Sequence, residues 1–424
     1  MSSAAAHETI DVAALRVGMF VQLDLGWLSH PFPLSSFRIS SEDQIATIRA
    51  LGLKRVRWSS EQSDSGNAAA ASAAAPLAAE AAVPAESPEA RARREHRERL
   101  RAERAALMQC ERQFAEAARE LKRAFDLVGA QPAEAGTHAA ALAKGLADKM
   151  LGADELCIRL LSEAAGDKAS THALNVALVS MLMGRSFGLA EADMLDLGAG
   201  ALMHDVGKLD LPDRVRHRED HFSAAEQRLY EEHVAFGLAQ ARKMKLTQGA
   251  TLVVAQHHEH ADGSGFPLKL GTDRMSPLAR IVALVNRYDN LCNPHVIAHA
   301  LTPHEALSTL FAQSKTKFDT AILGAFIKMM GVYPPGSAVQ LTDDRYALVV
   351  SVNSSRPLKP RVLVHESGVP RDEALLLDLE HADGLGIRRS LRPQQLPATT
   401  LAYLAPRPRV AYFFEPVRDG DAPA

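Results

Sequence analysis

Two short runs of sequence decide the fold of this chain. Residues 204–208 read His-Asp-Val-Gly-Lys, and residues 257–267 read His-His-Glu-His-Ala-Asp-Gly-Ser-Gly-Phe-Pro. Each run begins with two adjacent side chains that bind metal ions, and single histidines stand at positions 172 and 233. Imidazoles suit Fe, Mn or Zn, and one carboxylate can bridge two ions through its two oxygens. The pattern predicts a shell for two divalent metal ions.

A two-metal shell favours hydrolysis of phosphate esters. Two ions a few ångströms apart clamp the attacking and leaving oxygens of an in-line displacement, and they lower the pKa of bound water. Such a site needs no side-chain nucleophile, and the sequence signals no Ser-His-Asp arrangement. The His-Asp pair closes an apolar stretch, where charged groups are costly unless they are paired or bound to metal. We therefore interpret the two runs as one metal site.

These runs resemble the HD-GYP family, a branch of the HD-superfamily metal phosphohydrolases. The resemblance covers about residues 150–335 and rests on His172, the run at 204–208, Leu211-Pro212-Asp213, His233, the run at 257–265 and Arg280-Ile281. It implies an all-helical domain that binds cyclic di-GMP, a bacterial second messenger, and usually hydrolyses it. It also implies that Asp205 bridges two metals. The histidines of the first metal would be His172 and His204, and those of the second His233, His257 and His258.

The resemblance also assigns substrate contacts. Lys208 is the natural partner of a phosphate, although a solvated lysine at a helix end is the alternative. The loop at 262–267 contributes Asp262, Gly265, Phe266 and Pro267, and its glycines let the backbone approach a ligand closely. Phe266 stands where the family has tyrosine. Its ring can still stack on a guanine, but the hydroxyl that would donate a hydrogen bond is missing.

Three further positions depart from the family. Asn286 replaces an aspartate that ligates the first metal, so an uncharged amide oxygen would have to coordinate the ion. The arginines that grip phosphates in the family are absent from the aligned stretch 293–298. The family's Lys-Pro-Gly is Arg218-Glu219-Asp220, which keeps a cation at Arg218. We expect Asp289 to orient a ligand by hydrogen bonding. Surface or local hydrogen-bonding roles are expected for His221, His295, His299 and His304.

Composition limits the class of protein. The 424 residues allow two or three domains. A net charge of −3 argues against nucleic acid and anionic membranes as partners. Three distant cysteines and the lack of a secretory signal predict reduced thiols in the cytoplasm. No apolar run reaches 18 residues, so we expect no membrane span.

The chain is expected to be mainly α, in five segments. We assign a small α+β domain to 1–60, an Ala/Pro/Ser-rich linker to 61–87, charged connecting helices to 88–150, the all-helical metal phosphohydrolase to 151–335, and a small β-rich extension and tail to 336–424. The first segment resembles the domain of unknown function often found ahead of HD-GYP domains, and a scaffold or dimerisation role is favoured over ligand sensing. The helix expected at 88–127 either forms a coiled-coil homodimer or lies on its own domain, and the sequence leaves both open.

Local patterns predict the individual elements. In the first segment we expect strands at about 18–24 and 54–58 around a helix at about 40–52. Later helices are expected at about 137–151, 154–165, 169–187, 191–206, 223–243, 247–258, 277–292, 303–313 and 319–330. Strands are expected at 338–341, 347–352 and 361–364. Residues 365–424 are too mixed to assign and carry no evident chemistry.

Two main hypotheses follow, one for an enzyme and one for a binding protein. The first is a cytoplasmic phosphodiesterase that opens cyclic di-GMP to the linear dinucleotide or to GMP, with two metal ions that are Fe or Mn in preference to Zn. The second is a catalytically weak or inactive module that binds cyclic di-GMP or docks other signalling proteins, because Asn286, Phe266 and the missing arginines weaken the site. A third hypothesis, ranked last, keeps the metal chemistry and changes the substrate to another nucleotide or cyclic dinucleotide.

Overall fold

The structure, a computed structural model, describes residues 8–26, 30, 32, 35–59, 62–63, 87–162, 166–217, 222–313, 316–382 and 384–417. The chain divides into two compact units, residues 1–94 and 95–424. It is mainly α, as predicted. Most of the expected linker at 61–87, and Arg218 to His221 of the expected substrate loop, lie outside the described residues.

The first unit is a small α+β domain. Among its described residues, an antiparallel sheet has the strand order β1 (Glu8–Asp11), β4 (Arg55–Ser59), β2 (Phe20–Gln22) and β3 (Ser36–Arg38). Helix α1 (Glu42–Ala50) begins after Ser41, whose side chain accepts a hydrogen bond from the Gln44 backbone N–H. Ile45 and Ile48 bury one face of this helix in the same core as Val21 and Trp58. The predicted helix and both predicted strands are confirmed.

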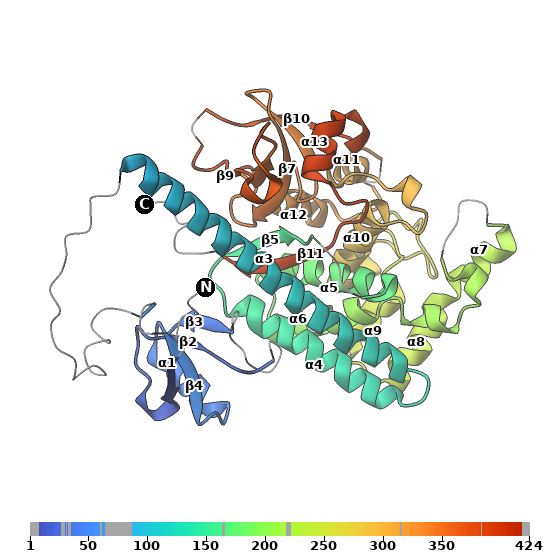
Figure 1. The fold of residues 1–424 in the computed structure, drawn as a ribbon. Helices are drawn as coiled ribbons and strands as arrows, with labels where there is room; N and C mark the ends of the chain where they lie inside the picture. Colours follow the sequence, from blue (N-terminus) through green and yellow to red (C-terminus); the bar gives the residue numbers. More distant parts are fainter. Residues whose placement is uncertain are drawn as a thin grey trace. The chain divides into compact units, whose positions relative to one another are not determined.

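The second unit holds the predicted helices. In chain order they are α3 (Pro88–Leu127), α4 (Pro132–Leu151), α5 (Lys168–Ser186), α6 (Glu191–Met203), α7 (Ala224–Glu231), α8 (His233–Lys243), α9 (Gln248–Gln256), α10 (Pro277–Cys292), α11 (Pro303–Gln313) and α12 (Thr320–Met330) (Figure 1). Helix α5 packs against both α6 and α10, and it is buried along most of its length. Among the described residues, the structure has no helix with the length and apolar character needed to cross a membrane.

Two helix predictions are wrong in detail. The segment expected as a helix at 154–165 instead contains strand β5 (Leu156–Leu160). The helix expected at 223–243 is broken at Glu232 into α7 and α8. Its start is confirmed, because Ser223 and Glu226 form the predicted capping box. The break places His233 at the first position of α8.

A second antiparallel sheet explains the first of these errors. Among the described residues its order is β10 (Ile387–Leu391), β6 (Ala338–Leu341), β7 (Tyr346–Asn353), β5 and β11 (Tyr412–Pro416), with β8 (Arg361–Val364) on β7 and β9 (Leu376–Asp378) on β8. The three predicted strands are confirmed as β6, β7 and β8. Strand β5 is extended because it pairs on one side with β7 and on the other with β11. The sheet therefore joins the helical part of the chain to its C-terminal region.

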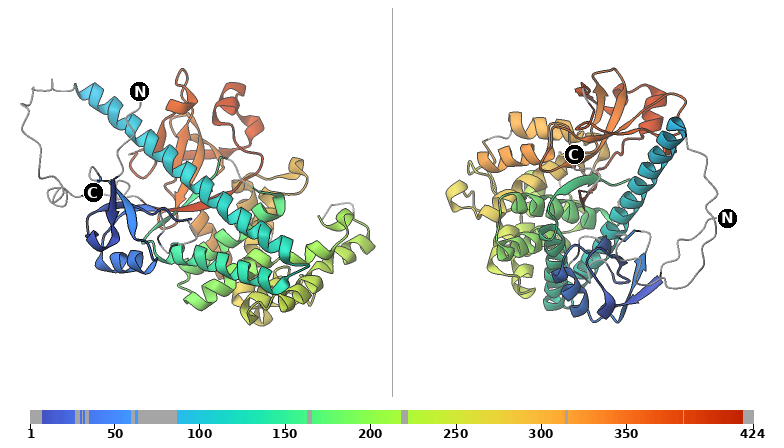
Figure 2. Two further views of the ribbon diagram at one scale, coloured as in Figure 1. Left: turned by 60° about the horizontal axis from the view of Figure 1, so that its bottom comes forward. Right: turned by 90° about the vertical axis from the view of Figure 1, so that its left-hand side faces the viewer.

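Helix α3 lies on its own unit over its second half. Cys110, Phe114 and Leu121 are buried there, and Phe114 meets Phe413 of β11 edge to face. Figures 1 and 2 show α3 running beside α4, and His138 Nδ1 lies 3.7 Å from Glu120 Oε2 across the two helices. The structure thus supports the alternative of a helix packed on its own domain for this half.

Candidate metal centre

The expected metal ligands meet at the ends of four helices. His172 lies in α5, His204 caps the end of α6, His233 begins α8, and His257 caps the end of α9. Asp205 follows at the turn into a short 3-10 helix, Val206–Asp210.

The glycine of the first run has a packing role. A Cβ on Gly207 would lie 2.0 Å from the backbone oxygen of His233 and 2.2 Å from the backbone nitrogen of Gly237. Only a residue without a side chain lets the 3-10 turn lie this close to α8. The glycine two positions after Asp205 therefore allows Asp205 and His233 to come together.

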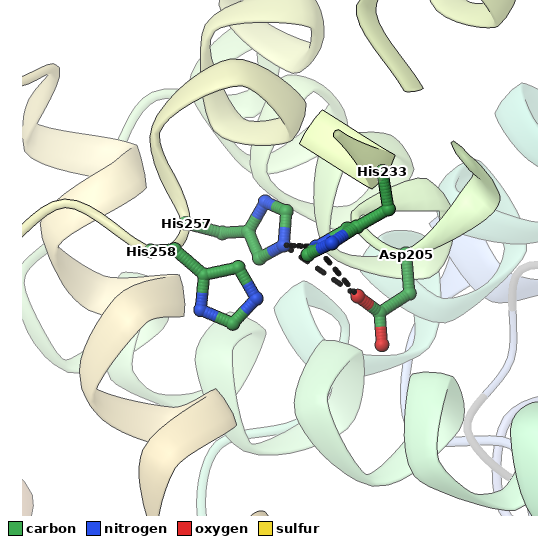
Figure 3. A group of neighbouring side chains, drawn as sticks. All are labelled: Asp205, His233, His257 and His258. Carbon is green, nitrogen blue, oxygen red and sulfur yellow. Dashed lines mark hydrogen bonds and ion pairs between the residues drawn. The ribbon is translucent and has the colours of Figure 1, made fainter. Parts of the chain in front are cut away.

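Asp205 lies between two groups of histidines, and each of its oxygens faces one group. Oδ1 lies 3.5 Å from His257 Nε2 and 3.7 Å from His233 Nε2. Oδ2 lies 3.4 Å from His204 Nε2 and 3.6 Å from His172 Nε2. We call Asp205, His233, His257 and His258 the three-histidine cluster (Figure 3). We call Asp205, His172 and His204 the two-histidine cluster.

Hydrogen bonds fix the orientation of four rings. Three of them pair Nδ1 with the carbonyl oxygen three residues earlier: His204 with Ala201 at 2.8 Å, His233 with Tyr230 at 2.5 Å and His257 with Val254 at 2.8 Å. His172 differs, because its Nδ1 lies 2.6 Å from Asp289 Oδ2. A neutral ring that donates from Nδ1 carries its lone pair on Nε2. All four Nε2 lone pairs therefore face Asp205, where they are available to a metal ion.

The spacing of these ligands fits a metal ion in each cluster. His172 Nε2 and His204 Nε2 are 3.2 Å apart, and His233 Nε2 and His257 Nε2 are 3.3 Å apart. Two facing lone pairs cannot form a hydrogen bond with each other. Two nitrogens about 2.1 Å from one ion, at an angle of about 90–110°, lie about 3.0–3.4 Å apart. Asp205 Oδ1 and His258 Nε2 are also buried with no hydrogen-bond partner among the described residues.

The electrostatics favour the protonation states that bind metal. Burial lowers the pKa of His204 and His258, and it lowers the pKa of His233 to about 3. These rings are neutral at pH 7, as metal ligation requires. Burial alone would raise the pKa of Asp205, but Lys208 and His204 hold it well below its usual range.

Lys208 is paired with the bridging carboxylate. Its Nζ lies 2.6 Å from Asp205 Oδ2 and 5.4 Å from the ring centroid of Tyr230. Burial opposes its charge, but Asp205 and Tyr230 outweigh burial and raise the pKa of Lys208. The lysine expected to bind phosphate is therefore a permanent cation beside the two-histidine cluster.

The second run forms a braced loop over the three-histidine cluster. The buried Glu259 accepts hydrogen bonds from the backbone N–H groups of Leu268 at 2.7 Å and Leu270 at 2.8 Å. A Cβ on Gly265 would lie 2.4 Å from the His260 backbone nitrogen, so the loop closes on itself only with glycine there.

The aromatic residue of this loop covers a ligand. Phe266 stacks on His258 with ring centroids 4.5 Å apart and planes at 20°, so one face of the phenylalanine is occupied. Asp262 and Pro267, the other two residues of this loop expected to contact substrate, are exposed. Asp262 Oδ1 accepts a hydrogen bond from the Ser264 backbone N–H at 2.9 Å.

The structure also places Asn286, where the family has aspartate, and the other polar residues singled out in the sequence. Asn286 is buried in α10, and its Oδ1 accepts a hydrogen bond of 2.6 Å from the Asn290 side chain. Asp289 was expected to order hydrogen bonds around the site, and the structure places its Oδ2 2.6 Å from His172 Nδ1. His295 stacks on His217 with centroids 4.3 Å apart, and His304 Nδ1 donates to the Val332 carbonyl at 2.8 Å.

Sequence reasoning missed three residues that shape this centre. Tyr230 supplies the carbonyl that orients His233 and the ring that contacts Lys208. Its place three residues before a ligand histidine, like Ala201 and Val254, is a signal that could have found it. Asn175 and Asn293 both bond to Asp289, and nothing in the local sequence marks either one.

Two parts of the chain match models of known domains. Residues 155–322 match the HD domain model. The chain thus contains an HD domain. Residues 7–139 match a domain of unknown function, DUF3391, as the resemblance of the first segment implies. The HD domain implies binding of divalent metal ions, in agreement with the two clusters.

Two named proteins and one solved structure are similar to this chain. It is 29% identical over 363 residues to a protein of Pseudomonas aeruginosa named as a cyclic di-GMP phosphodiesterase, and the match covers 84% of each chain. It is 29% identical over 163 residues to a Vibrio cholerae protein named as a 3'3'-cGAMP-specific phosphodiesterase, covering 38% of this chain and 31% of that protein. A solved HDG"Y"P protein from Bdellovibrio bacteriovorus aligns with 76% of this chain and 98% of its own, at a TM-score of 0.41 and 15% identity.

Proposed function

We propose that this HD-domain protein is a metal-dependent phosphodiesterase of the HD-GYP type that hydrolyses cyclic di-GMP. The observation that carries the proposal is Asp205, whose two oxygens each face a separate pair of histidine Nε2 atoms. A bridging carboxylate between two ligand sets is the arrangement that two-metal phosphoester chemistry needs. The name of the Pseudomonas relative supports cyclic di-GMP as the substrate.

Each cluster would hold one divalent ion. The two-histidine cluster supplies two imidazoles and a carboxylate oxygen, and the three-histidine cluster supplies three imidazoles and the other oxygen. When bound, the ions supply an activated water and neutralise charge on the phosphoryl group. A mixed nitrogen and oxygen ligand set without thiolates suits Fe or Mn, which we prefer to Zn. Asn286 is proposed as a further, uncharged ligand of the two-histidine cluster.

Protein residues would then bind and orient the dinucleotide. Lys208 keeps its proton at neutral pH and can donate hydrogen bonds to a phosphate oxygen, which stabilises negative charge that develops there. We propose that Arg218 and the loop residues Asp262, Gly265, Phe266 and Pro267 complete the substrate site. The exposed positions of Asp262 and Pro267 are compatible with contact to a ligand.

A second candidate is a weak or inactive enzyme that binds cyclic di-GMP or another signalling protein. Asn286 favours it, because the amide brings no negative charge to the two-histidine cluster and its oxygen already accepts a hydrogen bond from Asn290. A site that keeps only one tight metal would retain the fold and lose the second charge that stabilises the transition state.

The test combines metal content with turnover. Protein purified without oxygen is analysed for bound metal and then incubated with cyclic di-GMP in the presence of Mn²⁺ or Fe²⁺, with products separated by chromatography. Two metals per chain and turnover that disappears in Asp205→Ala support the phosphodiesterase. No turnover with either metal sinks it and leaves the binding module. Faster cleavage of 3'3'-cGAMP than of cyclic di-GMP would keep the chemistry and correct the substrate.

A further inference from the structure

One carboxylate connects a metal-ligand candidate to two asparagines. Asp289 in α10 is 2% exposed. Its Oδ2 lies 2.6 Å from His172 Nδ1. Its Oδ1 accepts a hydrogen bond of 2.8 Å from the Asn175 side chain and another of 2.8 Å from the Asn293 side chain. Both carboxylate oxygens are thus engaged, one by an imidazole and the other by two amides.

The C-terminal part of the chain fixes both amides. The backbone N–H of Tyr412 donates to Asn175 Oδ1 at 3.2 Å, and that of Val410 donates to Asn293 Oδ1 at 2.8 Å. A backbone N–H can only donate, so these contacts assign each amide oxygen and therefore each NH₂ group. The second hydrogen of each NH₂ goes to the Val410 carbonyl oxygen, at 3.0 Å from Asn175 and 2.9 Å from Asn293. Neither amide can flip without losing these bonds.

The segment that holds the amides is itself anchored. Strand β11 pairs with β5 along its whole length, from Tyr412 opposite Leu160 to Pro416 opposite Leu156. The Tyr412 hydroxyl lies 3.1 Å from that of Tyr288 in α10. These contacts fix the backbone at Val410 and Tyr412 relative to the sheet. That backbone in turn fixes the two asparagine side chains.

This arrangement selects the form of His172 that can bind metal. Two N–H donors occupy Asp289 Oδ1, and Oδ2 is left to accept from His172 Nδ1. The Nδ1–H tautomer leaves the lone pair on Nε2, which lies 3.2 Å from His204 Nε2. His204 needs no such support, because its own preceding turn supplies the carbonyl that orients it. His172 alone among the four oriented rings depends on a distant part of the chain.

We propose that Asn175 and Asn293 are positioning residues through which the segment 410–412 sets the metal affinity of the two-histidine cluster. The inference rests on the proposed function only in taking a divalent metal as the ligand, and it does not require hydrolysis. It gives the C-terminal strand a role in the centre, although the sequence of 365–424 shows no chemistry of its own.

The experiment uses the full chain and Co²⁺, whose absorption reports each bound ion. Asn293→Ala removes one amide. Asn175→Asp keeps the oxygen that accepts from Tyr412 and the shape of the side chain, and it replaces the NH₂ group that donates to Asp289 and to the Val410 carbonyl with an oxygen. Asn353→Ala is the matched control, because its side-chain amide in the same sheet bonds to Glu155 at 3.3 Å. Loss of a direct hydrogen-bond partner of a ligand costs about 10–100-fold in metal affinity. Asn175 and Asn293 act one step further out, through Asp289, so we expect the lower end, a loss of about tenfold, for one Co²⁺ in both test variants and none in the control.

A second readout separates positioning from general damage. Nitrogen chemical shifts of the metal-free protein, assigned with His172→Gln, should show the Nδ1–H tautomer of His172 in the wild type. Both test variants should gain the Nε2–H form at a temperature at which each is still fully folded, although the polar groups left without partners lower their melting temperatures. Folded variants that keep the tautomer and bind both Co²⁺ ions within about twofold of the wild type overturn the inference, since it predicts a loss of about tenfold for one ion.

Failure of the inference can be told from failure of the proposed function. A wild-type protein that binds two Co²⁺ ions but never cleaves a cyclic dinucleotide removes the enzyme, and the variants still test the positioning role. A wild-type protein that cleaves, with both test variants unchanged in Co²⁺ affinity and His172 tautomer, removes the positioning role alone. An equal loss of affinity in Asn353→Ala would also remove it.

Discussion

The two clusters share Asp205 but are built in different ways. In the three-histidine cluster, His233 and His257 are oriented by carbonyls three residues earlier, and Phe266 stacks on His258 from a nearby loop. In the two-histidine cluster, His172 is oriented by Asp289, which lies 117 residues away in sequence. The first cluster is therefore specified by local sequence, and the second by the packing of distant elements. The second should be the weaker site and the easier one to alter.

The largest effect should come from the residue that the two clusters share. Asp205→Asn keeps the shape but removes the charge that faces all four Nε2 atoms. We expect metal affinity in both clusters to fall by more than the about 10–100-fold that follows loss of an outer hydrogen bond. Asp193→Asn, on the exposed side of α6, is the control. Metal analysis that still finds two tightly bound ions in Asp205→Asn would contradict the bridging role.

One substitution, which exchanges an amide nitrogen for an oxygen, should reduce the difference in metal affinity between the two clusters. Asn286→Asp restores a carboxylate in α10 and should strengthen the two-histidine cluster. A unit charge about 4 Å from another, at an effective dielectric constant of about 20, contributes about 4 kcal/mol. Even if burial of the carboxylate offsets most of this, a gain of about tenfold remains.

Gln248→Glu is the control for this gain, because it adds the same charge at the exposed start of α9, the helix whose other end carries His257. The measurement is a Mn²⁺ titration followed by electron paramagnetic resonance. Equal gains from the two substitutions would mean that added charge acts at long range, and that position 286 is not a ligand position.

The two clusters also show what sequence can and cannot predict. The ligand candidates are recognisable because the two runs, taken together with His172 and His233, resemble the HD-GYP family, whereas a single His-Asp pair would not be distinctive. Strand β5 was mistaken for a helix because its extended form depends on β11, more than 250 residues later. The roles of Asn175 and Asn293 were invisible for the same reason. An asparagine becomes informative only when the backbone that it bonds to is known, and Val410 and Tyr412 lie in a strand that the sequence did not reveal.

Acid should destabilise the metal-free protein through the three-histidine cluster. Burial lowers the pKa of His233 to about 3, whereas an unfolded chain has a histidine pKa of about 6.5. Between these values the unfolded state binds the extra proton. His233 therefore makes its full contribution to the free energy of unfolding above about pH 6.5. That contribution falls by about 1.4 kcal/mol per pH unit as the pH drops towards 3.

Urea unfolding in the presence of a chelator, at pH 7 and pH 5, measures this slope. In His233→Gln the slope should become shallower, and the exposed His381→Gln serves as control. Equal slopes in the wild type and His233→Gln would show that His233 is not a buried neutral ring in the metal-free protein.

The smallest effect is expected at the aromatic residue of the loop. Phe266→Tyr restores a hydroxyl whose hydrogen bond to a bound dinucleotide would contribute about 0.5–1.5 kcal/mol. The stack on His258 uses the ring face and not its edge, so the metal content should not change. We therefore expect KM for cyclic di-GMP to fall by less than about tenfold, with kcat nearly constant. Phe266→Leu, which removes the stack, should instead weaken metal binding in the three-histidine cluster. If Phe266→Tyr changes metal content as much as Phe266→Leu does, the residue serves the metal centre and has no separate part in substrate binding.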